Sequence, residues 1–588
     1  MKQNKSKIEY DLVLVGASPA NLTLAHNILD LAKEDPDFNF SIAILEKAQD
    51  FGGHIVSGAV VHPSIFNKAF PAHVKDGMPI EAICKKSYVS LMGYEEKWDI
   101  PSALTRAGAA DFVKEGYYIL SLSNVVAWMA ENLKAKAADV PNVKLDLFPG
   151  FPAMEIIYEG DKVSGLRVDR TGNDNDDILY SKLVCFADKG FLSKDLIKKF
   201  DLETNPQIWS VGVKETWQLN DSAEDIEGMV WHTLGYPTLD GTLGGGFVYG
   251  LRNKRVTIGL VISLDSSNPN VHPQKQLQEY KKHPFFQKML KGAELMHYGA
   301  AVLPEGGYAS LPKKFQVNGA MLLGDALGLL DVKALAGVDK AIESGYIAAK
   351  VAYAALKAND FSETKLSKYQ KYLLESPLMD KYKDNRYFRK AFIENPDLLA
   401  KYLPEIVKSI DETKNPVLGA LKVASSSPLT AGKAFLRAAS LLNNAKELKE
   451  EISYIPGYKH IDPNFNRQLM DRCKGGDNYS KNTIYSREDA VFYANTKYDE
   501  HPQHIDEFNA DTCLSCIKTY EAKNLDVPCV SDCTAEVHRL DISDNNLRVH
   551  AMSLENCVQC RTCELVCPEQ NLRVNPAYAG SGPDFRGL

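Results

Sequence analysis

Residues 11–21 read DLVLVGASPAN, and this stretch decides the fold of the first part of the chain. The run DLVLV predicts a short buried strand of the parallel-sheet type. A helical stretch, LTLAHNILDLAKE, follows, and a second strand, FSIAILE, ends at Glu46. A strand, turn, helix and strand that end in an acidic residue have the layout of a dinucleotide-binding Rossmann unit. The sequence therefore predicts an α/β fold with a nucleotide at the carboxyl end of its first strand.

The turn after the first strand carries an incomplete glycine fingerprint. Gly16 is in place, but Ser18 and Asn21 stand where the second and third glycines belong. Ser18 adds a side chain where the backbone approaches phosphate, and we expect Asn21 to loosen the packing of helix on strand. Backbone N–H groups at the helix N-terminus would bind a pyrophosphate, and Glu46 would accept hydrogen bonds from ribose hydroxyls. The predicted cofactor contacts here are Gly16, Ser18, Pro19, Ala20, Glu46 and Lys47. A Rossmann turn without a ligand is the alternative.

A second segment favours a flavin as the nucleotide. Residues 319–326, GAMLLGDA, predict an apolar strand that ends in Gly324 and Asp325, and a helix is expected to begin near Gly337. In flavoproteins such a Gly-Asp pair contacts the ribityl chain of FAD, and the next helix points its N-terminus at the isoalloxazine. That helix end stabilises negative charge on the reduced flavin. A helix N-cap is the alternative role for Asp325, and a second fingerprint for NAD(P)H is not evident.

Eight of the eleven cysteines lie in the last 76 residues, in two groups of four. The second group reads Cys557-x2-Cys560-x2-Cys563-x3-Cys567-Pro568, which is the bacterial ferredoxin spacing for a [4Fe–4S] cluster. Zinc sites prefer two short pairs separated by a longer loop, so this run is too dense for ordinary zinc. The group therefore predicts iron–sulfur ligation.

The first group, Cys513-x2-Cys516-x12-Cys529-x3-Cys533, is looser. In two-cluster ferredoxins the fourth cysteine of each motif ligates the other cluster. We therefore expect one cluster on Cys533, Cys557, Cys560 and Cys563, and a second on Cys513, Cys516, Cys529 and Cys567. Two clusters are favoured over one, and the alternative is a single cluster with idle or zinc-bound thiols.

Composition limits the functional class. The chain has 588 residues, 45% of them hydrophobic and 24% charged, and a formal net charge of −8. These are globular values, and the negative charge argues against a nucleic-acid partner. The polar start MKQNKSKIEYD lacks the apolar core of a secretory signal, and no apolar run is long enough to span a bilayer. We expect a cytoplasmic protein, or one on the cytoplasmic face of a membrane.

A flavin unit first and a ferredoxin-like domain last resemble the electron-transfer flavoprotein–ubiquinone oxidoreductase family. Three further segments carry the resemblance: residues 52–59 (GGHIVSGA), residues 243–249 (LGGGFVY) and residues 298–312 (YGAAVLPEGGYASLP). The first of these adds Ser57 and Gly58 to the expected cofactor contacts. The second supplies candidates that face the quinone, namely Gly244, Gly245, Phe247 and Tyr249.

The resemblance implies a FAD-binding domain of the glutathione-reductase type, an antiparallel sheet facing substrate or quinone, and a C-terminal α+β ferredoxin-like domain. Electrons would arrive singly from reduced electron-transfer flavoprotein, pass through cluster and FAD, and leave in pairs on ubiquinone or menaquinone. The cofactors do this chemistry, so no catalytic side chain is expected. The partners implied are the donor flavoprotein and a membrane quinone, with peripheral membrane association.

Three features depart from the family. The family keeps one cluster and lacks a cysteine at the position of Cys567, and its flavin turn keeps the glycines that Ser18 and Asn21 replace here. The segment used for membrane entry is also altered. Residues 428–442, PLTAGKAFLRAASLL, predict an amphipathic helix that lies either in a membrane interface or against its own domain.

The same interpretation of the sequence gives the expected domains. The FAD domain is discontinuous, a β domain faces the quinone, a helical segment carries the possible membrane contact, and a linker leads to the ferredoxin-like domain. Their ranges are 1–70, 115–200 and 300–360 for FAD, 200–300 for the β domain, 360–455 for the helices, 455–510 for the linker and 510–588 for the clusters.

Three other functions fit the same motifs. The chain could be an electron hub that passes electrons to a ferredoxin-like acceptor, or an FAD-dependent reductase of isoprenoid double bonds. The third alternative is an interaction module whose cysteines bind zinc.

Overall fold

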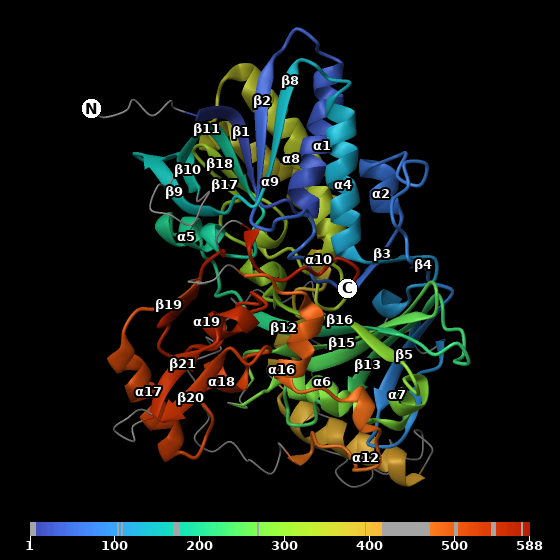
Figure 1. Ribbon diagram of the computed structural model, residues 1–588. Coiled ribbons are helices and arrows are strands. Elements are labelled where there is room, and N and C mark those ends of the chain that lie inside the picture. Colours follow the sequence, from blue (N-terminus) through green and yellow to red (C-terminus); the bar gives the residue numbers. More distant parts are fainter. Residues whose placement is uncertain are drawn as a thin grey trace.

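The computed structural model describes residues 8–102, 105–106, 110–168, 177–266, 268, 270–393, 395–413, 471–498, 504–542, 548–577 and 580–588. The predicted interfacial helix at residues 428–442 lies outside these ranges. Figure 1 shows an upper α/β lobe, a lower lobe built on a second sheet, and a C-terminal part beside the lower lobe.

The upper lobe contains a largely parallel sheet with the strand order β17-β18-β11-β1-β2-β8. Strand β1 lies between β2 and β11 and is parallel to both, as the Rossmann unit requires. Strands β9 and β10 extend the sheet beyond β11 in antiparallel fashion. The strands are β1 (Ile8–Val15), β2 (Phe40–Glu46), β8 (Val143–Pro149), β9 (Ala153–Glu159), β10 (Lys162–Val168), β11 (Asp177–Phe186), β17 (Gln316–Val317) and β18 (Ala320–Leu322).

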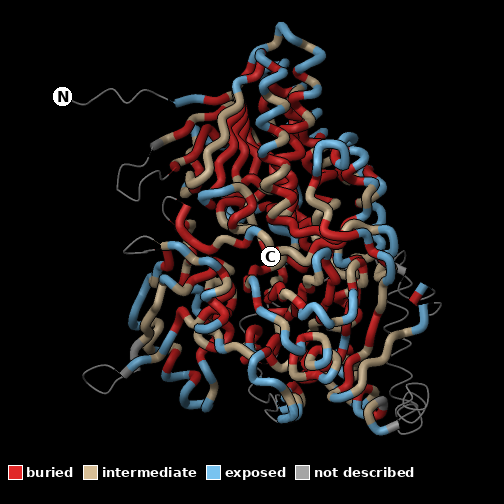
Figure 2. Tube along the Cα trace, turned by 45° about the vertical axis from the view of Figure 1, so that its right-hand side comes forward, coloured by how far each residue is buried: buried red, intermediate tan, exposed pale blue. Residues whose placement is uncertain are grey.

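Helix α1 (Pro19–Lys33) packs between α4 (Leu122–Ala137) and α8 (Val338–Ala358), as the upper lobe of Figure 1 shows. The contact of α1 with α8 is close because Gly345 has no side chain. A Cβ at Gly345 would lie 2.0 Å from the main-chain oxygen of Ala20. The apolar faces of these helices and the sheet form one large buried core, coloured red in Figure 2.

The lower lobe is built on a seven-stranded sheet with the order β16-β12-β15-β14-β13-β5-β6. We expected an antiparallel sheet from residues 200–300. The pairs among β12 to β16 are antiparallel, but β5 joins from earlier in the chain and pairs parallel with β13. The strands are β5 (Lys86–Met92), β6 (Lys97–Asp99), β12 (Trp209–Gln218), β13 (Met229–Gly235), β14 (Gly244–Leu251), β15 (Arg255–Ser263) and β16 (Glu294–Pro304).

Shorter elements surround the two sheets. A three-stranded sheet, β3 (Ala59–Val61), β7 (Tyr118–Leu120) and β4 (Ala82–Ile83), connects the lobes, with α2 (Ser64–Ala69) beside it. The remaining helices of the two lobes are α5 (Leu192–Lys199), α6 (Pro273–Lys282), α7 (Pro284–Met289), α9 (Glu363–Leu374), α10 (Pro377–Asp384), α11 (Phe388–Ile393) and α12 (Leu403–Thr413).

The C-terminal part is α+β and packs on β16. The hydroxyl of Tyr298 on β16 donates to the main-chain oxygen of Thr534 at 2.7 Å, and both residues are buried. The chain end then returns to the upper lobe, where the hydroxyl of Ser121 donates to the main-chain oxygen of Leu588 at 2.9 Å. Its elements are α16 (Arg487–Val491), β19 (Ile505–Glu507), α17 (Ala510–Ala522), α18 (Pro528–Ser531), β20 (His538–Ile542), β21 (Arg548–Met552), α19 (Thr562–Val566) and β22 (Leu572–Val574).

Candidate functional site

A cavity of about 680 Å³ lies where the upper lobe, the lower sheet and the C-terminal part meet. The carboxyl ends of β1, β2 and β11 form one wall, the β14 face of the lower sheet forms a second, and residues 558–561 form a third. Ligands of open α/β sheets bind at such carboxyl ends. The predicted site residues on its walls are Gly16, Ser18, Pro19, Glu46, Lys47, Ser57, Gly58, Gly244, Gly245, Phe247, Tyr249, Asp325 and Gly337.

The turn after β1 has the conformation that a nucleotide-binding turn needs. Gly16 has φ +84°, a region that favours glycine. Ser18 is the N-cap of α1, and its hydroxyl accepts a hydrogen bond from the amide of Asn21 at 3.4 Å. The extra side chain at Ser18 is therefore bonded to the first turn of α1. Ala20 is fully buried against α8 and does not line the cavity.

Asn21 does not loosen the packing of α1 on β1, contrary to the expectation from the sequence. Its side-chain amide donates to the main-chain oxygens of Val15 at 2.9 Å, Gly16 at 3.0 Å and Cys185 at 3.3 Å. These bonds connect the start of α1 to the ends of β1 and β11. A polar side chain thus stabilises a turn that the fingerprint would build with glycine.

Glu46 supports the same turn from the end of β2. Its carboxylate accepts hydrogen bonds from the amides of Ala17 at 3.0 Å and Ala48 at 2.8 Å. Burial raises the pKa of this carboxyl, and the two amide bonds act in the opposite direction. A carboxylate has about four acceptor positions, so Glu46 retains capacity for ribose hydroxyls.

The segment after β18 presents a helix end to the cavity. Asp325 lies half-buried on the cavity wall, where desolvation raises its pKa. It lies in a short 3-10 turn, Gly324–Leu327, and the N-cap position of α8 belongs to Gly337, so Asp325 does not cap that helix. Residues 337–341 line the cavity, which places the positive end of a 21-residue helix beside it. Gly324 lies behind the wall, where a Cβ would be 3.2 Å from the Cβ of Ala20.

The lower sheet contributes an aromatic surface. The ring of Phe247 stacks on that of Tyr249 with centroids 4.9 Å apart. A Cβ at Gly58 would lie 2.9 Å from the Phe247 ring, and one at Gly259 would lie 2.1 Å from it. The two glycines therefore make room for Phe247 between the lower sheet and the segment before β3.

His232 on β13 completes this surface, and the sequence analysis did not single it out. Its Nε2 is 3.2 Å from the Tyr249 hydroxyl, while its buried Nδ1 has no hydrogen-bond partner in the described part of the chain. Burial lowers the pKa of His232 to about 3, so the ring is neutral near pH 7. A single histidine in an apolar strand gives little sequence signal, because only the register of β13 with β14 brings it to Tyr249.

Lys114 is a second residue that the sequence did not reveal. Its ammonium lines the cavity and donates to the main-chain oxygen of Ala334 at 2.8 Å. Burial lowers its pKa to about 8, and the carboxylates of Asp339 and Asp111 oppose that effect. The residue lies between secondary-structure elements, where periodicity carries no information.

The eight C-terminal cysteines separate into two sets. In the inner set, Cys557, Cys560 and Cys563 lie within seven residues of each other, and the hydroxyl of Thr534, next to Cys533, is 3.5 Å from Cys560 Sγ. In the outer set, Cys513, Cys516, Cys529 and Cys567 line one small hollow. The division is the crossed one expected from the spacing, in which Cys533 and Cys567 exchange groups.

Polar groups surround the sulfurs of the inner set. The amide of Gln559 donates to Cys557 Sγ at 3.3 Å, and the amide of Val537 donates to Cys533 Sγ at 3.3 Å. The hydroxyl of Thr562 lies 3.3 Å from Cys560 Sγ. Such donors stabilise thiolates that bind a metal cluster. The inner set thus has the chemistry of a buried cluster site.

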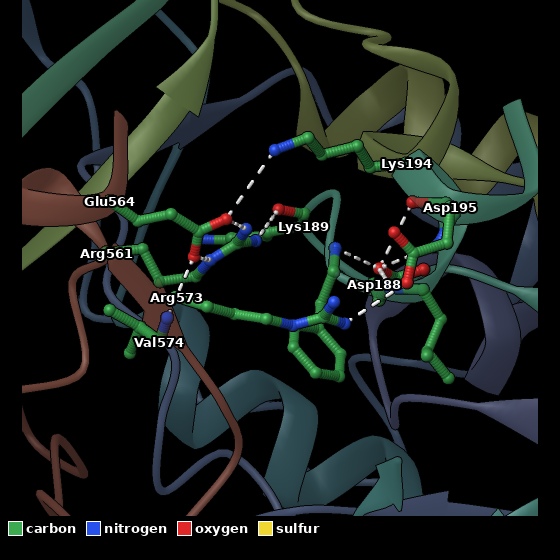
Figure 3. Close-up of polar contacts among 11 residues, drawn as sticks. Asp188, Lys189, Lys194, Asp195, Arg561, Glu564, Arg573 and Val574 are labelled. Atoms are coloured by element: carbon green, nitrogen blue, oxygen red, sulfur yellow. Dashed lines mark hydrogen bonds and ion pairs between the residues drawn. The ribbon is translucent and has the colours of Figure 1, made fainter. Parts of the chain in front are cut away.

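The loop that carries the inner cysteines reaches the nucleotide end of the cavity. Cys560 lines the cavity, and the side-chain oxygen of Gln559 accepts from Lys47 Nζ at 3.0 Å. Burial lowers the pKa of Lys47 to about 8. Figure 3 shows the adjoining contact, where Arg561 pairs with Glu564 at 2.8 Å and Arg573 with Asp195 at 3.1 Å. The predicted cluster and nucleotide sites are therefore neighbours.

Comparisons with known proteins agree with these features. A model of the family described as "ETF-QO, ubiquinone-binding" matches residues 209–303, which span most of the lower sheet. Proteins named as probable or established electron transfer flavoprotein-ubiquinone oxidoreductases cover 99% of this chain and 99% of their own lengths. They are 28% identical in Acinetobacter baylyi and 29% identical in Pseudomonas aeruginosa. The human mitochondrial protein of that name is 33% identical over 58% of this chain and 56% of its own.

These similarities agree with the resemblance found in the sequence. Among solved structures, a geranylgeranyl bacteriochlorophyll reductase-like protein from Thermoplasma acidophilum superposes with a TM-score of 0.53 at 21% identity. It covers 74% of this chain and 100% of its own, and the likeness shows a shared fold.

Proposed function

We propose that this chain, whose family is that of the electron-transfer flavoprotein–ubiquinone oxidoreductases, passes electrons from a reduced electron-transfer flavoprotein through an iron–sulfur cluster and FAD to a membrane quinone. One observation carries the proposal. A single cavity is bounded by the dinucleotide turn, by the sheet that the quinone-binding model matches, and by the loop of the inner cysteines.

FAD fits the upper wall of the cavity. The turn at Gly16 and the first turn of α1 would hold the pyrophosphate, Glu46 the ribose, and Asp325 the ribityl chain. The N-terminus of α8 would lie beside the isoalloxazine. Ser57 and Gly58 would complete the flavin site, and Ala20 and Gly324 would shape it from behind.

A [4Fe–4S] cluster fits the inner set, Cys533, Cys557, Cys560 and Cys563, within a ferredoxin-like C-terminal domain. When bound, the cluster supplies one-electron steps, and the flavin accepts single electrons and delivers pairs. A protein with one cluster and a protein with two can both perform this reaction, so the proposal requires only the inner set.

The quinone ring would lie against Gly244, Gly245, Phe247 and Tyr249. Reduction of a quinone to a quinol takes two electrons and two protons, so its oxygens need hydrogen-bond donors. The Tyr249 hydroxyl, backed by His232, can donate to one quinone oxygen. The Lys114 ammonium contributes positive charge to the same cavity. These side chains add donors to a site where we expected the cofactors alone.

The quinone implies contact with a membrane surface, and we place the protein peripherally on the cytoplasmic side. In the described residues no helix combines the length and apolarity needed to cross a bilayer. The domain boundaries expected from the sequence form part of this proposal, including a helical segment at 360–455 next to the membrane and a linker at 455–510.

Stopped-flow mixing tests the function. Anaerobically purified protein is mixed with reduced electron-transfer flavoprotein, and flavin and cluster absorbance are followed before and after a short-chain quinone is added. We expect reduction by the donor and then rapid reoxidation by ubiquinone or menaquinone. Reoxidation by a ferredoxin but by neither quinone would support the hub function instead. Reduction of a prenyl double bond without quinol formation would support the isoprenoid reductase. A colourless zinc protein would refute all three redox functions.

A further inference from the structure

We propose that Cys513, Cys516, Cys529 and Cys567 hold a second [4Fe–4S] cluster, which lies nearer the surface than the first and is the point where single electrons enter. The proposal rests on the proposed function only for the direction of electron flow. The comparisons assign no second metal site to this chain.

The fold brings the four outer cysteines to one place from three elements. Cys513 and Cys516 are three residues apart on α17, so they share one helix face. Cys529 lies on α18, and Cys567 follows directly after α19. All four cysteines line the same small hollow. The rest of the hollow is lined by apolar side chains and by four polar ones: Ile517, Val527, Leu540, Pro568 and Leu572, with Thr512, His550, Glu569 and Asn571.

Asn571 provides hydrogen bonds to this set. Its amide N–H donates to Cys567 Sγ at 3.2 Å, and its side-chain Nδ2 donates to Cys513 Sγ at 3.1 Å. The same Nδ2 also donates to the main-chain oxygen of Asn509 at 2.7 Å, which fixes its orientation. N–H donors to cysteine sulfur stabilise thiolate ligands and tune a cluster's reduction potential.

Two stacked histidines, His538 and His550, lie beside the outer cysteines. The ring of His538 is fully buried, and its Nε2 has no hydrogen-bond partner among the described residues. The Nδ1 is occupied, because it lies 2.8 Å from His550 Nε2, and His550 in turn lies 2.8 Å from Glu507. One ring nitrogen of His538 is within 4.8 Å of the Cys529 thiol. His550, rather than His538, lines the hollow itself.

Zinc is the competing occupant, because four cysteines also form a structural zinc site. The crossed division of the two groups favours iron. Cys567 is part of the dense second run but turns into the outer hollow, whereas Cys533 from the first group lies with the inner set. Exchange of the fourth ligand between two adjacent motifs is the arrangement of two-cluster ferredoxins.

The exposure of the cysteines indicates which of the two sites lies nearer the surface. Cys513 and Cys516 of the outer set are partly exposed, whereas its other two cysteines and all but Cys560 of the inner set are buried. Cys560 of the inner set faces the flavin cavity. Electrons entering from the surface would thus meet the outer cluster first, then the inner one, then the flavin. Each transfer oxidises the donor by one electron, reduces the acceptor by one, and moves no proton.

Metal analysis of anaerobically purified protein tests the proposal. We expect about eight irons and eight sulfides per flavin in the natural protein, and about four of each in the Cys513→Ala/Cys516→Ala variant. The control variant is Cys473→Ala, which replaces a buried cysteine outside both sets and should keep all eight irons and eight sulfides. About four irons with one zinc in the natural protein would overturn the proposal, as would an unchanged iron count in the double variant.

Spectroscopy separates loss of a cluster from misfolding. Dithionite-reduced natural protein should show an electron paramagnetic resonance signal broadened by two interacting clusters, and the double variant should show one simple signal. Asn571→Leu should keep eight irons and lower the reduction potential of one cluster only, because it removes the side-chain donor to Cys513. A potential that does not move would count against the outer site.

The outcomes also distinguish this proposal from the proposed function. Natural protein that produces quinol but holds four irons would refute only the second cluster. Natural protein that holds eight irons but reduces no quinone would refute only the quinone reaction. In the double variant we expect quinol formation from chemically reduced protein to continue and electron uptake from the donor flavoprotein to slow.

Discussion

Arg561 donates a hydrogen bond from Nη1 to the main-chain oxygen of Lys189 across 2.7 Å. Arg561 lies between two cysteines of the inner set, and Lys189 follows the carboxyl end of β11 on the flavin wall. Figure 3 shows the two chain segments joined at this point. This bond holds the loop of the inner cysteines against the predicted nucleotide site, so the spacing between the two proposed redox centres depends on it.

Replacing Arg561 should therefore weaken the junction. Arg561→Gln removes the bond to Lys189 and leaves Glu564, which is largely buried, without its 2.8 Å partner. We expect the free energy of unfolding to fall by about 2–3 kcal/mol, and the reduced cluster to pass electrons to the flavin more slowly. Denaturant titration and stopped-flow absorbance measure the two effects. Arg573→Gln is the matched control, because its pair with Asp195 is more exposed and should contribute less than about 1 kcal/mol.

The pair of His232 and Tyr249 should act on the quinone step alone. Tyr249→Phe removes the hydroxyl, and His232→Gln the imidazole, from the 3.2 Å contact at the cavity wall. We expect quinol formation to slow by about 10²-fold, while reduction of the flavin by the donor protein keeps its natural rate. Tyr236→Phe is the control, because this buried tyrosine donates to the main chain of Glu279 away from the cavity. Equal slowing of both half-reactions would show a structural effect instead.

Lys114 predicts a dependence of stability on pH. Its pKa is lowered from 10.5 to about 8 by burial, with Asp339 and Asp111 acting in the opposite direction and Lys381 and Lys340 acting in the same direction as burial. Between these pH values the unfolded chain binds more protons than the folded chain, so this residue makes stability rise with pH. The cost of its burial is fully present below pH 8 and amounts to about 3 kcal/mol.

The Lys114→Met variant isolates this effect. We expect the variant's stability relative to the natural protein to decline by about 2 kcal/mol between pH 7 and pH 9.5, because the natural protein gains over that interval. Urea titrations of both proteins at the two pH values measure it. A difference that stays constant with pH would mean that the folded lysine keeps its ordinary pKa.

A buried ion pair connects helix α6 to the lower sheet. Lys281 on α6 lies 2.7 Å from Glu215 on β12, and both side chains are fully buried. Lys281→Met leaves Glu215 as an uncompensated charge, and we expect a loss of about 3–5 kcal/mol in the free energy of unfolding. Lys281→Met/Glu215→Gln should recover a large part of that loss. A double variant no more stable than the single one would contradict this account.

Asn21 should be required for retention of the flavin. Asn21→Ala leaves three main-chain oxygens at the turn without their side-chain donor, which we expect to cost about 1–3 kcal/mol. Flavin content after dialysis and the midpoint of thermal unfolding should both fall. Asn27→Ala, on the same helix but away from the cavity, is the comparison that should retain flavin.

The sequence was sufficient to predict a helix or strand where the residues of that one short segment determine its structure. The predicted helical stretch LTLAHNILDLAKE lies in α1, Pro19–Lys33, except for its last residue, because its apolar positions recur at helical spacing. The strand before Gly16 and the strand that ends at Glu46 are β1 and β2 for a similar reason. The prediction for Asn21 was wrong for a physical reason. Its side chain binds main-chain oxygens of β1 and also of β11, and the latter is more than 160 residues away.

The sequence by itself determined the kinds of chemistry present, because cysteine spacing and the strand–turn–helix order are properties of short stretches of chain. Tertiary structure alone decided which groups meet. The register of β13 with β14 brings His232 to Tyr249, the fold of the C-terminal part places Cys567 with Cys513, and Arg561 reaches Lys189 over 372 positions. Contacts at such separations depend on packing of the whole chain, and no local pattern of residues records them.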